Sequence, residues 1–182
     1  ERGRIGVFNR SYYEEVLVVR VHPEFLAGQK LPQGLVTDRI WKERFEDINA
    51  FERYATRQGI RILKFFLNVS REEQHERFLA RLEEPEKNWK FSAEDVAKRD
   101  LWDQYMAAYE DMIGSTSTEH APWHVIPADK KWFMRAAVAD TIVATMEGLD
   151  LSFPVLTGKQ QKALEECRSL LTKEKKEKKK KS

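Results

Sequence analysis

The chain has 182 residues, of which 41% are hydrophobic and 11% aromatic, which is enough for one globular domain with its own core. The formal net charge is +2, but residues 173–181 hold seven lysines and two glutamates and so contribute +5, which leaves −3 for the rest and excludes a broadly cationic nucleic-acid binder. The single cysteine, Cys167, excludes an internal disulfide, and no apolar run approaches the roughly 20 residues of a membrane helix, so we expect a soluble cytoplasmic protein.

Three short apolar runs predict buried β-strands, and each is followed by a segment with helical spacing. The runs are residues 4–8, 62–69 and 123–127. Strands that alternate with helices indicate an α/β fold with a parallel sheet and right-handed crossovers. In such sheets ligands bind at the carboxyl ends of the strands. We therefore expect the functional residues in the segments that directly follow the three runs.

Several segments with an apolar residue at every third or fourth position predict helices. They are residues 12–21, 38–57, 93–112, 131–146 and 159–172, with one more helix beginning at Arg71. Capping boxes, in which a serine side chain satisfies a free amide of the first turn, mark three of the starts. The boxes are Ser11 with Glu14, Ser70 with Glu73, and Ser92 with Asp95. Asp129 is the expected N-cap of the helix from residue 131, and Gly59, Gly114 and Gly148 are expected to end helices.

The helix of residues 38–57 carries an apolar stripe that we expect to pack on the sheet. Its members are Trp41, Phe45, Ile48 and Ala55. Either Phe51 or Glu52 completes the stripe, and the spacing does not choose between them.

A polar and aromatic group, residues 8–14, follows the first predicted strand. A ligand phosphate can meet Arg10 there, because the guanidinium fork matches phosphate oxygens. The same spacing is explained equally well if Asn9 and Ser11 only cap a helix, so both interpretations stay open.

Four basic residues follow the second predicted strand, and we call them the cationic strip. They are Arg77, Arg81, Lys87 and Lys90. Arg77 and Arg81 share a helix face, and such a strip suits a flexible linear polyanion, whose successive phosphates need cations at intervals. The alternative is an ordinary solvated helix face, because glutamates are interleaved with these cations.

The third predicted strand is followed by Asp129, Lys130 and Lys131. The lysines can reach a phosphate at a helix N-terminus, or Asp129 can simply cap that helix. Other chemistries find little support, because the four histidines lack metal-ligand spacing and no Gly-x-x-x-x-Gly-Lys-Ser/Thr loop occurs in the chain.

Several motifs occur in order along the chain. They are GVFNRSYYE at 6–14, KFFLNVS at 64–70, EQ at 73–74, RFLAR at 77–81, PEKNWK at 85–90, APW at 121–123 and ADKK at 128–131. This ordered set closely resembles the polyphosphate kinase 2 family, from about residue 4 to residue 154. The resemblance implies a P-loop kinase-like α/β fold, with a three-layer parallel sheet and helices on both faces. It also implies Mg²⁺-assisted phosphoryl transfer between polyphosphate and AMP, ADP or a related nucleotide, in a full-length protein that is a homo-oligomer.

The resemblance also implies roles for single residues. The catalytic candidates are Asn9, Arg10, Arg77 and Arg81, and the candidates for binding polyphosphate or nucleotide are Tyr13, Glu14, Lys87, Lys90, Lys130 and Lys131. Asn9 and Arg10 match the family's Walker B-like motif, and the cationic strip matches its lid over the polyphosphate path. Asn9 stands where other members carry aspartate, so the protein ligands of Mg²⁺ stay open.

Residues 1–156 are expected to form a partial polyphosphate kinase 2 domain with a helical lid at about 71–114. Residues 157–182 are expected to form a helix and a lysine-rich tail, which should be mobile because it has no apolar side chain to bury. The fold is expected to be incomplete at the N-terminus, because the family's Walker A loop has no counterpart here. The strand that leads into that loop would lie between the first and second predicted strands. We therefore expect the 182 residues alone to be poorly stable, and inactive or nearly so.

Two other functions fit parts of the sequence. The chain can be a non-catalytic module whose lysine tail attaches it to polyphosphate or nucleic acid through salt-sensitive contacts. Nucleic acid is the less favoured of these partners, because the rest of the chain is acidic. The chain can also be an ATP-dependent nucleoside monophosphate kinase, which is a related class of enzyme.

Overall fold

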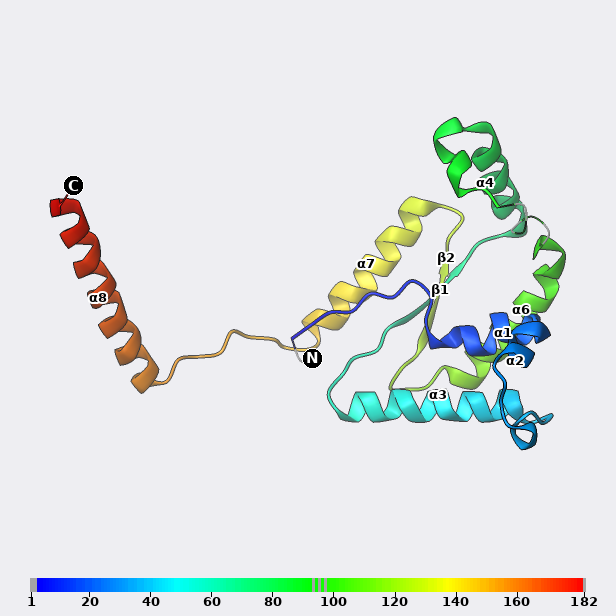
Figure 1. Cartoon of the computed structure of the whole chain (residues 1–182), viewed down its shortest axis with the longest axis horizontal. Coiled ribbons are helices and arrows are strands. Elements are labelled where there is room, and N and C mark those ends of the chain that lie inside the picture. The colour runs from blue at the N-terminus through cyan, green and yellow to red at the C-terminus, as the bar shows by residue number, and fades with distance from the viewer. Residues whose placement is uncertain (1–2, 93, 95, 97, 182) are drawn as a thin grey trace. The chain divides into compact units, whose positions relative to one another are not determined.

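The computed structural model describes residues 3–92, 94, 96 and 98–181, and the chain divides into two compact units, residues 1–142 and 143–182 (Figure 1). Helix α7 (Lys131–Glu147) begins in the first unit and ends in the second, which also contains α8 (Gly158–Lys181). Within the described ranges, no helix combines the length and the apolar character that a membrane crossing requires.

Two parallel strands form the sheet of the first unit, β1 (Lys64–Asn68) and β2 (Trp123–Pro127). Lys64 lies opposite Trp123, and Asn68 lies opposite Pro127. Parallel strands need a long connection, and the residues between β1 and β2 supply it mainly as helices. The carboxyl ends of both strands therefore meet at one edge of the sheet. The prediction of an α/β fold with a parallel sheet is confirmed for two of the three expected strands.

The first predicted strand, residues 4–8, is not a strand, so this prediction is wrong. Its apolar side chains are open to solvent, with Val7 90% and Phe8 83% exposed. A β-strand forms through backbone hydrogen bonds to a neighbour, and no strand among the described residues pairs with this segment. An apolar run is compatible with a β-strand, but the strand forms only when a neighbouring strand is present to pair with it.

The first unit is mainly helical. Before β1 lie η1 (Tyr12–Val16), α1 (Val18–Val21), α2 (Pro23–Gly28), η2 (Gln33–Leu35) and α3 (Ile40–Arg57), where η marks a short 3-10 helix. Between the strands lie α4 (Arg71–Glu83), η3 (Pro85–Lys90), η4 (Lys98–Leu101) and α6 (Trp102–Thr116). The helix predicted for residues 12–21 is interrupted at Leu17. In the one predicted for residues 93–112, Glu94 and Val96 are helical, and a 3-10 segment, η4, precedes α6.

The serine caps are partly as expected. Ser70 Oγ accepts a hydrogen bond from the amide of Glu73 at 3.0 Å, which confirms that cap. Ser11 Oγ accepts instead from the amide of Tyr13 at 3.4 Å, since the first turn is a tighter 3-10 turn. The third box depends on Asp95, which lies outside the described residues.

Two of the three glycines end helices as expected, since Gly59 follows α3 and Gly148 follows α7, whereas Gly114 does not end α6. Gly59 follows α3 with a φ of +85°, the left-handed conformation that glycine adopts without strain. α6 runs past Gly114 to Thr116, which is fully buried and donates its hydroxyl hydrogen to the carbonyl oxygen of Met112 at 2.6 Å. Burial of this last turn outweighs the roughly 1 kcal/mol that a glycine costs inside a helix.

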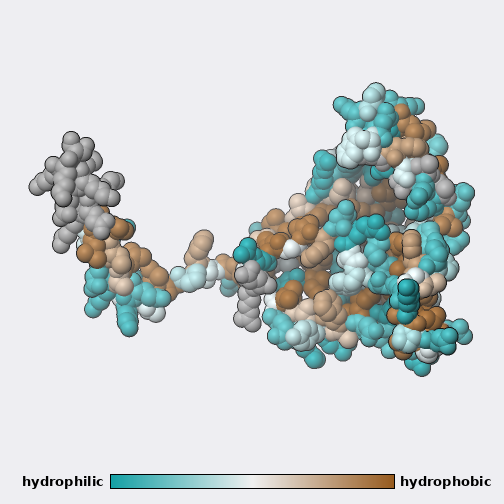
Figure 2. Space-filling model, in the orientation of Figure 1, coloured by the Kyte–Doolittle hydropathy of each residue, from teal (hydrophilic) through white to brown (hydrophobic). Residues whose placement is uncertain are grey.

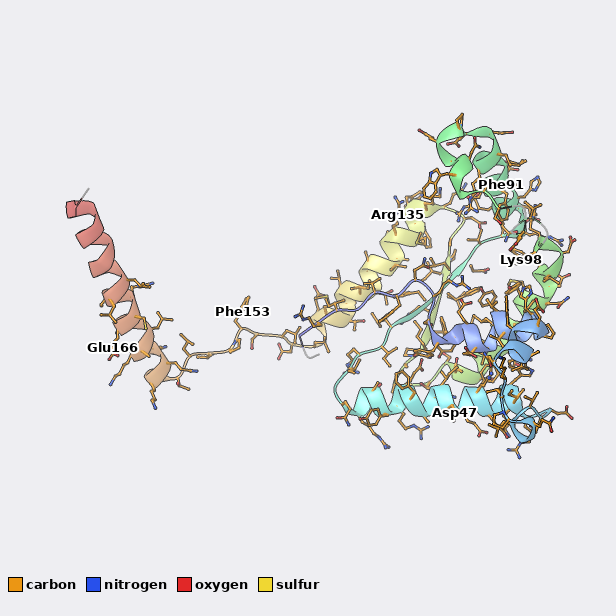
Figure 3. The ribbon with its side chains drawn as sticks, viewed as in Figure 1. Asp47, Phe91, Lys98, Arg135, Phe153 and Glu166 are labelled. Atoms are coloured by element: carbon orange, nitrogen blue, oxygen red, sulfur yellow. The ribbon has the colours of Figure 1, made fainter. Side chains whose placement is uncertain are left out.

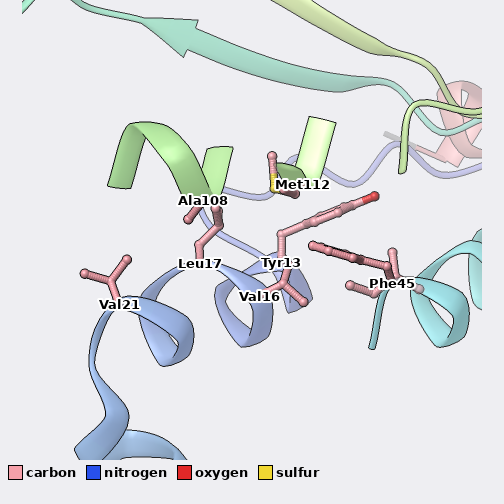
Figure 4. Packing of buried hydrophobic residues seen from close by; sticks show 8 residues of the cluster. Tyr13, Val16, Leu17, Val21, Phe45, Ala108 and Met112 are labelled. Atoms are coloured by element: carbon pink, nitrogen blue, oxygen red, sulfur yellow. The ribbon is translucent and has the colours of Figure 1, made fainter. Parts of the chain in front are cut away.

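The core of the first unit combines segments that are distant in sequence (Figure 4). Tyr13, Val16, Leu17 and Val21 come from η1, α1 and the residue between them, Phe45 and Ile48 come from α3, and Ala108 and Met112 come from α6. These side chains point toward one another, so α6 packs against helices that precede β1 in the chain.

A charged residue completes the apolar stripe of α3. Glu52 is 0% exposed, whereas Phe51 is 54% exposed. The partner of Glu52 is Lys64, the first residue of β1, whose Nζ donates to Glu52 Oε2 at 2.7 Å. Removal from water lowers the pKa of Lys64, and the carboxylate of Glu52 opposes this shift.

Other polar groups, most of them buried, join this pair in what we call the Glu52 network. The hydroxyl groups of Tyr12 and Tyr13 each donate to Glu52 Oε1 at 2.8 Å. Lys64 Nζ also donates to the hydroxyl oxygen of Tyr13 and to the carbonyl oxygen of Thr116, both at 2.8 Å. The network connects α3, η1, β1 and the end of α6 through polar groups that satisfy one another.

The second unit exposes most of its residues. The connection between α7 and α8 has no regular structure after residue 150, and Phe153 on it is 96% exposed and stands away from the ribbon (Figure 3). α8 continues through the lysine run to Lys181, whereas the prediction ended the helix near residue 172. Lysine is a good helix former, which favours this extension. The side chains of the lysine run lie outside the described residues, and the mobility of the tail stays a prediction.

The Glu52 network yields a stability prediction. Glu52→Gln keeps the shape of the side chain but leaves the Lys64 ammonium buried without a counter-charge. We expect a loss of about 3–5 kcal/mol in the free energy of unfolding, measured by urea denaturation. The control is Glu46→Gln on the same helix, whose pair with Lys42 is exposed and 4.0 Å long, and which should change stability by less than about 0.5 kcal/mol. Similar losses in the two variants would contradict the importance of the network.

Candidate functional site

The carboxyl ends of β1 and β2 border a hollow of about 380 Å³ in the first unit. Its lining comes from both strand ends and from the start of α7, and consists of Asn68, Ser70, Pro127, Asp129, Lys130, Trp132 and Phe133. We call it the strand-end hollow. Because ligands of parallel α/β sheets bind at this edge, it is the candidate site of the molecule.

The two sides of the hollow are joined through Asp129. Its Oδ1 accepts a hydrogen bond from the backbone amide of Ser70 at 2.7 Å. This hydrogen bond lowers the pKa of Asp129. The prediction that Asp129 serves as the N-cap of α7 needs correction, because its carboxylate instead binds the amide at the start of the neighbouring α4. Ser70 and Asp129 together fix the distance between the two loops.

Arg77 lies beside the hollow and binds the loop that follows β2, although it is not part of the lining. Its Nη2 donates to the carbonyl oxygens of Ala128 and Asp129, at 2.7 and 3.3 Å, and its Nε donates to Glu73 Oε1 at 2.8 Å. The guanidinium thus ties α4 to the loop that follows β2. Two predicted site residues, Arg77 and Lys130, are brought to this loop from different parts of the chain.

The remaining cationic strip continues along α4 and η3. The Arg81 guanidinium carbon lies 5.2 Å from the centre of the Phe78 ring. The Lys87 ammonium contacts the carboxylate of Glu84, and both side chains are about half exposed. The side chain of Lys90 lies outside the described residues. Arg81 and Lys87 are not part of the lining of the strand-end hollow.

Arg10 and Glu14 form a pair of their own. Arg10 Nε and Nη2 donate to the two carboxylate oxygens of Glu14, at 2.9 and 2.5 Å. The hydrogen bond to Glu14 and its negative charge raise the pKa of Arg10. Arg10, predicted to meet a ligand phosphate, is therefore already paired, while its neighbour Asn9 is exposed.

Tyr13 lies in the core and belongs to the Glu52 network. It is buried, and its hydroxyl group is bound by Glu52 and Lys64. Burial raises its pKa, so the phenol stays neutral. The part of Tyr13 in ligand binding stays a prediction.

Sequence reasoning did not single out three residues of the hollow, Asn68, Trp132 and Phe133. The signal for Asn68 was available, since it is a polar residue next to the end of the run predicted as a strand, residues 62–69. Trp132 gave no such signal, because an aromatic residue on a helix is more often part of a core. In the structure its ring is exposed and meets Phe133 edge to face, with the ring centres 5.9 Å apart.

No group of three histidine, cysteine or acidic side chains suited to a metal ion occurs in the part of the chain that the structure describes. The carboxylate of Asp129 is engaged with Ser70, and the carboxylate of Glu14 is engaged with Arg10. Mg²⁺ prefers carboxylate oxygens together with water and substrate phosphates. The described side chains therefore do not form a protein-built Mg²⁺ site.

Comparison with known proteins identifies relatives over most of the chain. The family model described as Polyphosphate kinase 2 (PPK2) matches residues 1–154. An ADP-polyphosphate phosphotransferase of Rhodopseudomonas palustris is 50% identical over 174 residues, which are 95% of this chain and 60% of that protein. An AMP/ADP-polyphosphate phosphotransferase of Meiothermus ruber is 46% identical, over 84% of this chain and 53% of that protein. This chain thus spans between half and two thirds of the length of these two relatives.

A solved structure resembles the fold as well. The crystal structure of Polyphosphate Kinase 2 from Arthrobacter aurescens TC1 matches with a TM-score of 0.75 at 43% sequence identity. The match covers 87% of this chain and 53% of that one. At this identity the likeness extends beyond a shared fold.

The contact between Asp129 and Ser70 predicts a pH dependence. A carboxylate with a lowered pKa stabilises the folded state above its unfolded pKa of about 3.9, and this contribution is lost as the pH falls through the folded pKa. We expect Asp129→Asn to melt below the unmodified chain at neutral pH, and the difference to shrink under acidic conditions, as followed by thermal unfolding. Asp140→Asn, an exposed carboxylate on α7, is the control and should change little. A difference that is the same at about pH 3 as at neutral pH would contradict the assignment.

Proposed function

The chain belongs to the polyphosphate kinase 2 family, and from that premise we propose that it takes part in phosphoryl transfer between inorganic polyphosphate and AMP, ADP or a related nucleotide. The nucleotides are suggested by the names of the two relatives, one an ADP-polyphosphate and the other an AMP/ADP-polyphosphate phosphotransferase. In this reaction a terminal phosphate oxygen of the nucleotide attacks the end phosphorus of polyphosphate. The bond to the rest of the polymer breaks, and the shortened polymer keeps the bridging oxygen.

The observation that supports this proposal most is the position of Arg77 beside the strand-end hollow. Phosphoryl transfer depends on positioning the reactants and on neutralising the charge of the transferred group, so fixed cations matter more than a nucleophilic side chain. Nε and Nη2 of Arg77 hold Glu73 and the loop after β2, and the two hydrogens of Nη1 are not used in these bonds. They can donate to phosphate oxygens while the rest of the guanidinium keeps its orientation.

Lysines at the start of α7 add to this charge. Lys130 lines the hollow, and Lys131 is the exposed first residue of the helix, where the free amides of the first turn also favour anions. Arg81 and Lys87 lie further along α4 and η3, and we assign them to the path of the polymer. Arg10 is assigned to the nucleotide side of the reaction, with Glu14 as its partner before the ligand binds. No covalent enzyme intermediate is required.

We further propose that the complete fold is the three-layer P-loop kinase-like architecture, with residues 71–114 as its lid. Residues 4–8 would then become a strand when a neighbouring strand is present, which would cover the exposed Val7 and Phe8. Mg²⁺ would supply charge neutralisation on the phosphates. Since the described side chains do not form a site for it, we assign it no protein ligand.

Arg77 is the residue to test. In a protein that contains the whole family domain, Arg77→Ala should lower kcat/KM for ATP formation from ADP and long-chain polyphosphate by at least about 100-fold, because a fixed donor to the transferred phosphoryl group is lost. The rate can be followed with a luciferase-coupled assay. Arg53→Ala, an exposed arginine on α3, is the matched control and should leave the rate unchanged. Activity of Arg77→Ala within twofold of the control would rule out the assigned role.

A second test concerns the 182 residues by themselves. We propose that turnover requires a phosphate-binding loop, which this sequence does not contain, so the isolated chain should produce no ADP from AMP and polyphosphate above background. Nucleotide products can be separated by ion-exchange chromatography. Robust turnover with polyphosphate would refute the requirement for the loop. Turnover with ATP but not with polyphosphate as donor would instead identify a nucleoside monophosphate kinase.

A further inference from the structure

Helix α8 lies beyond the residues that the family model matches, and nothing in the proposed reaction uses it. Every residue of its first part, 158–172, is exposed to solvent. In the space-filling view this part shows both apolar and polar side chains (Figure 2). The described part of the helix is not buried against other elements, so packing does not account for its presence. The feature that remains to be explained is the positive charge of the lysine run.

The lysine run contains more positive charge than the helix itself can balance. Glu174 and Lys178 are four residues apart, as are Glu177 and Lys181, and with the glutamate first this spacing is favourable in a helix. The other lysines include two like-charge pairs at the same spacing, Lys175 with Lys179 and Lys176 with Lys180. Like charges one turn apart repel, so an anion that lies along these two rows relieves the repulsion and stabilises the last turns.

The residue types indicate which anion fits. Residues 173–181 contain only lysine and glutamate, with no arginine and no aromatic residue. Proteins that bind single-stranded nucleic acid usually stack bases on aromatic rings, and base edges are commonly read by arginine. Lysine is a compact point charge that binds phosphate groups and does not recognise bases. A chain of phosphates without bases matches this composition best.

We propose that the end of α8 is a second binding site for polyphosphate, which holds the polymer while its end is used at the strand-end hollow. This inference rests on the proposed function for the identity of the ligand. Nine residues of α-helix span about 13 Å, so the two lysine rows can contact several successive phosphates. A long polymer can bind both sites at once, which makes the second contact intramolecular and raises the effective concentration of the polymer. A three-phosphate chain gains nothing, because it occupies one site at a time.

The test replaces four lysines in two ways in a protein that contains the whole family domain. One variant carries Lys175→Gln, Lys176→Gln, Lys179→Gln and Lys180→Gln, and the matched control carries arginine at the same four positions, which keeps the charge. We expect the glutamine variant to show an approximately 10-fold higher KM for long-chain polyphosphate, with kcat and the KM for tripolyphosphate unchanged. The arginine control should behave as the unmodified protein.

Direct binding provides the second measurement and separates this inference from the proposed function. Long-chain polyphosphate and a single-stranded DNA of matched charge are titrated into the unmodified protein and the glutamine variant at increasing salt. We expect tail-dependent, salt-sensitive binding of polyphosphate, together with a rise in helix content by circular dichroism. Tail-dependent binding without any turnover would refute the proposed function and leave this site standing. Equal binding and equal KM in both proteins, or DNA binding as tight as that of polyphosphate, would overturn the site.

Discussion

The ion pair between Glu52 and Lys64 is the contact on which the arrangement of the first unit depends. Both charges are buried, so each is tolerated only while the other is present. The pair fixes α3 to the first residue of β1, where that strand begins its pairing with Trp123 of β2. The indole nitrogen of Trp123 donates in turn to the hydroxyl oxygen of Thr116 at 2.9 Å. The register of the strands is therefore set at one end of the sheet. That register also fixes how the two strand ends lie beside each other at the strand-end hollow.

The caps and helices that the sequence predicts correctly have a local cause. The cap by Ser70 depends on an amide three residues away, and the helical periodicity of α3 is contained in that helix. Residues 4–8 show the limit of this reasoning, because pairing requires a neighbour that no local pattern can reveal. Glu52 shows a second limit, since hydrophobicity alone favours Phe51 and the buried lysine that reverses the choice lies on another element.

In the candidate site, too, some features could be predicted from the sequence and others could not. Residue types and motif order pointed to Arg77 and Lys130, and the structure brings both to the loop after β2. What Arg77 binds could not be predicted, since the carbonyl oxygen of Ala128 lies 51 positions away in sequence. The same holds for Asp129, which was expected to serve its own helix and serves the start of α4 instead. The type of a residue indicates what chemistry it can perform. Which group it binds depends on the fold.

The pairing of Arg10 with Glu14 has a consequence for selectivity. Arg10 has a φ of +72°, and both oxygens of the Glu14 carboxylate occupy its guanidinium. A ligand anion that binds Arg10 must replace the Glu14 carboxylate. Its binding free energy is therefore the difference between its own contact with Arg10 and the contact that Glu14 loses. The released carboxylate then repels the group that replaced it. Singly charged anions such as chloride gain almost nothing from this exchange, whereas a ligand with several phosphates can recover the loss through its other contacts.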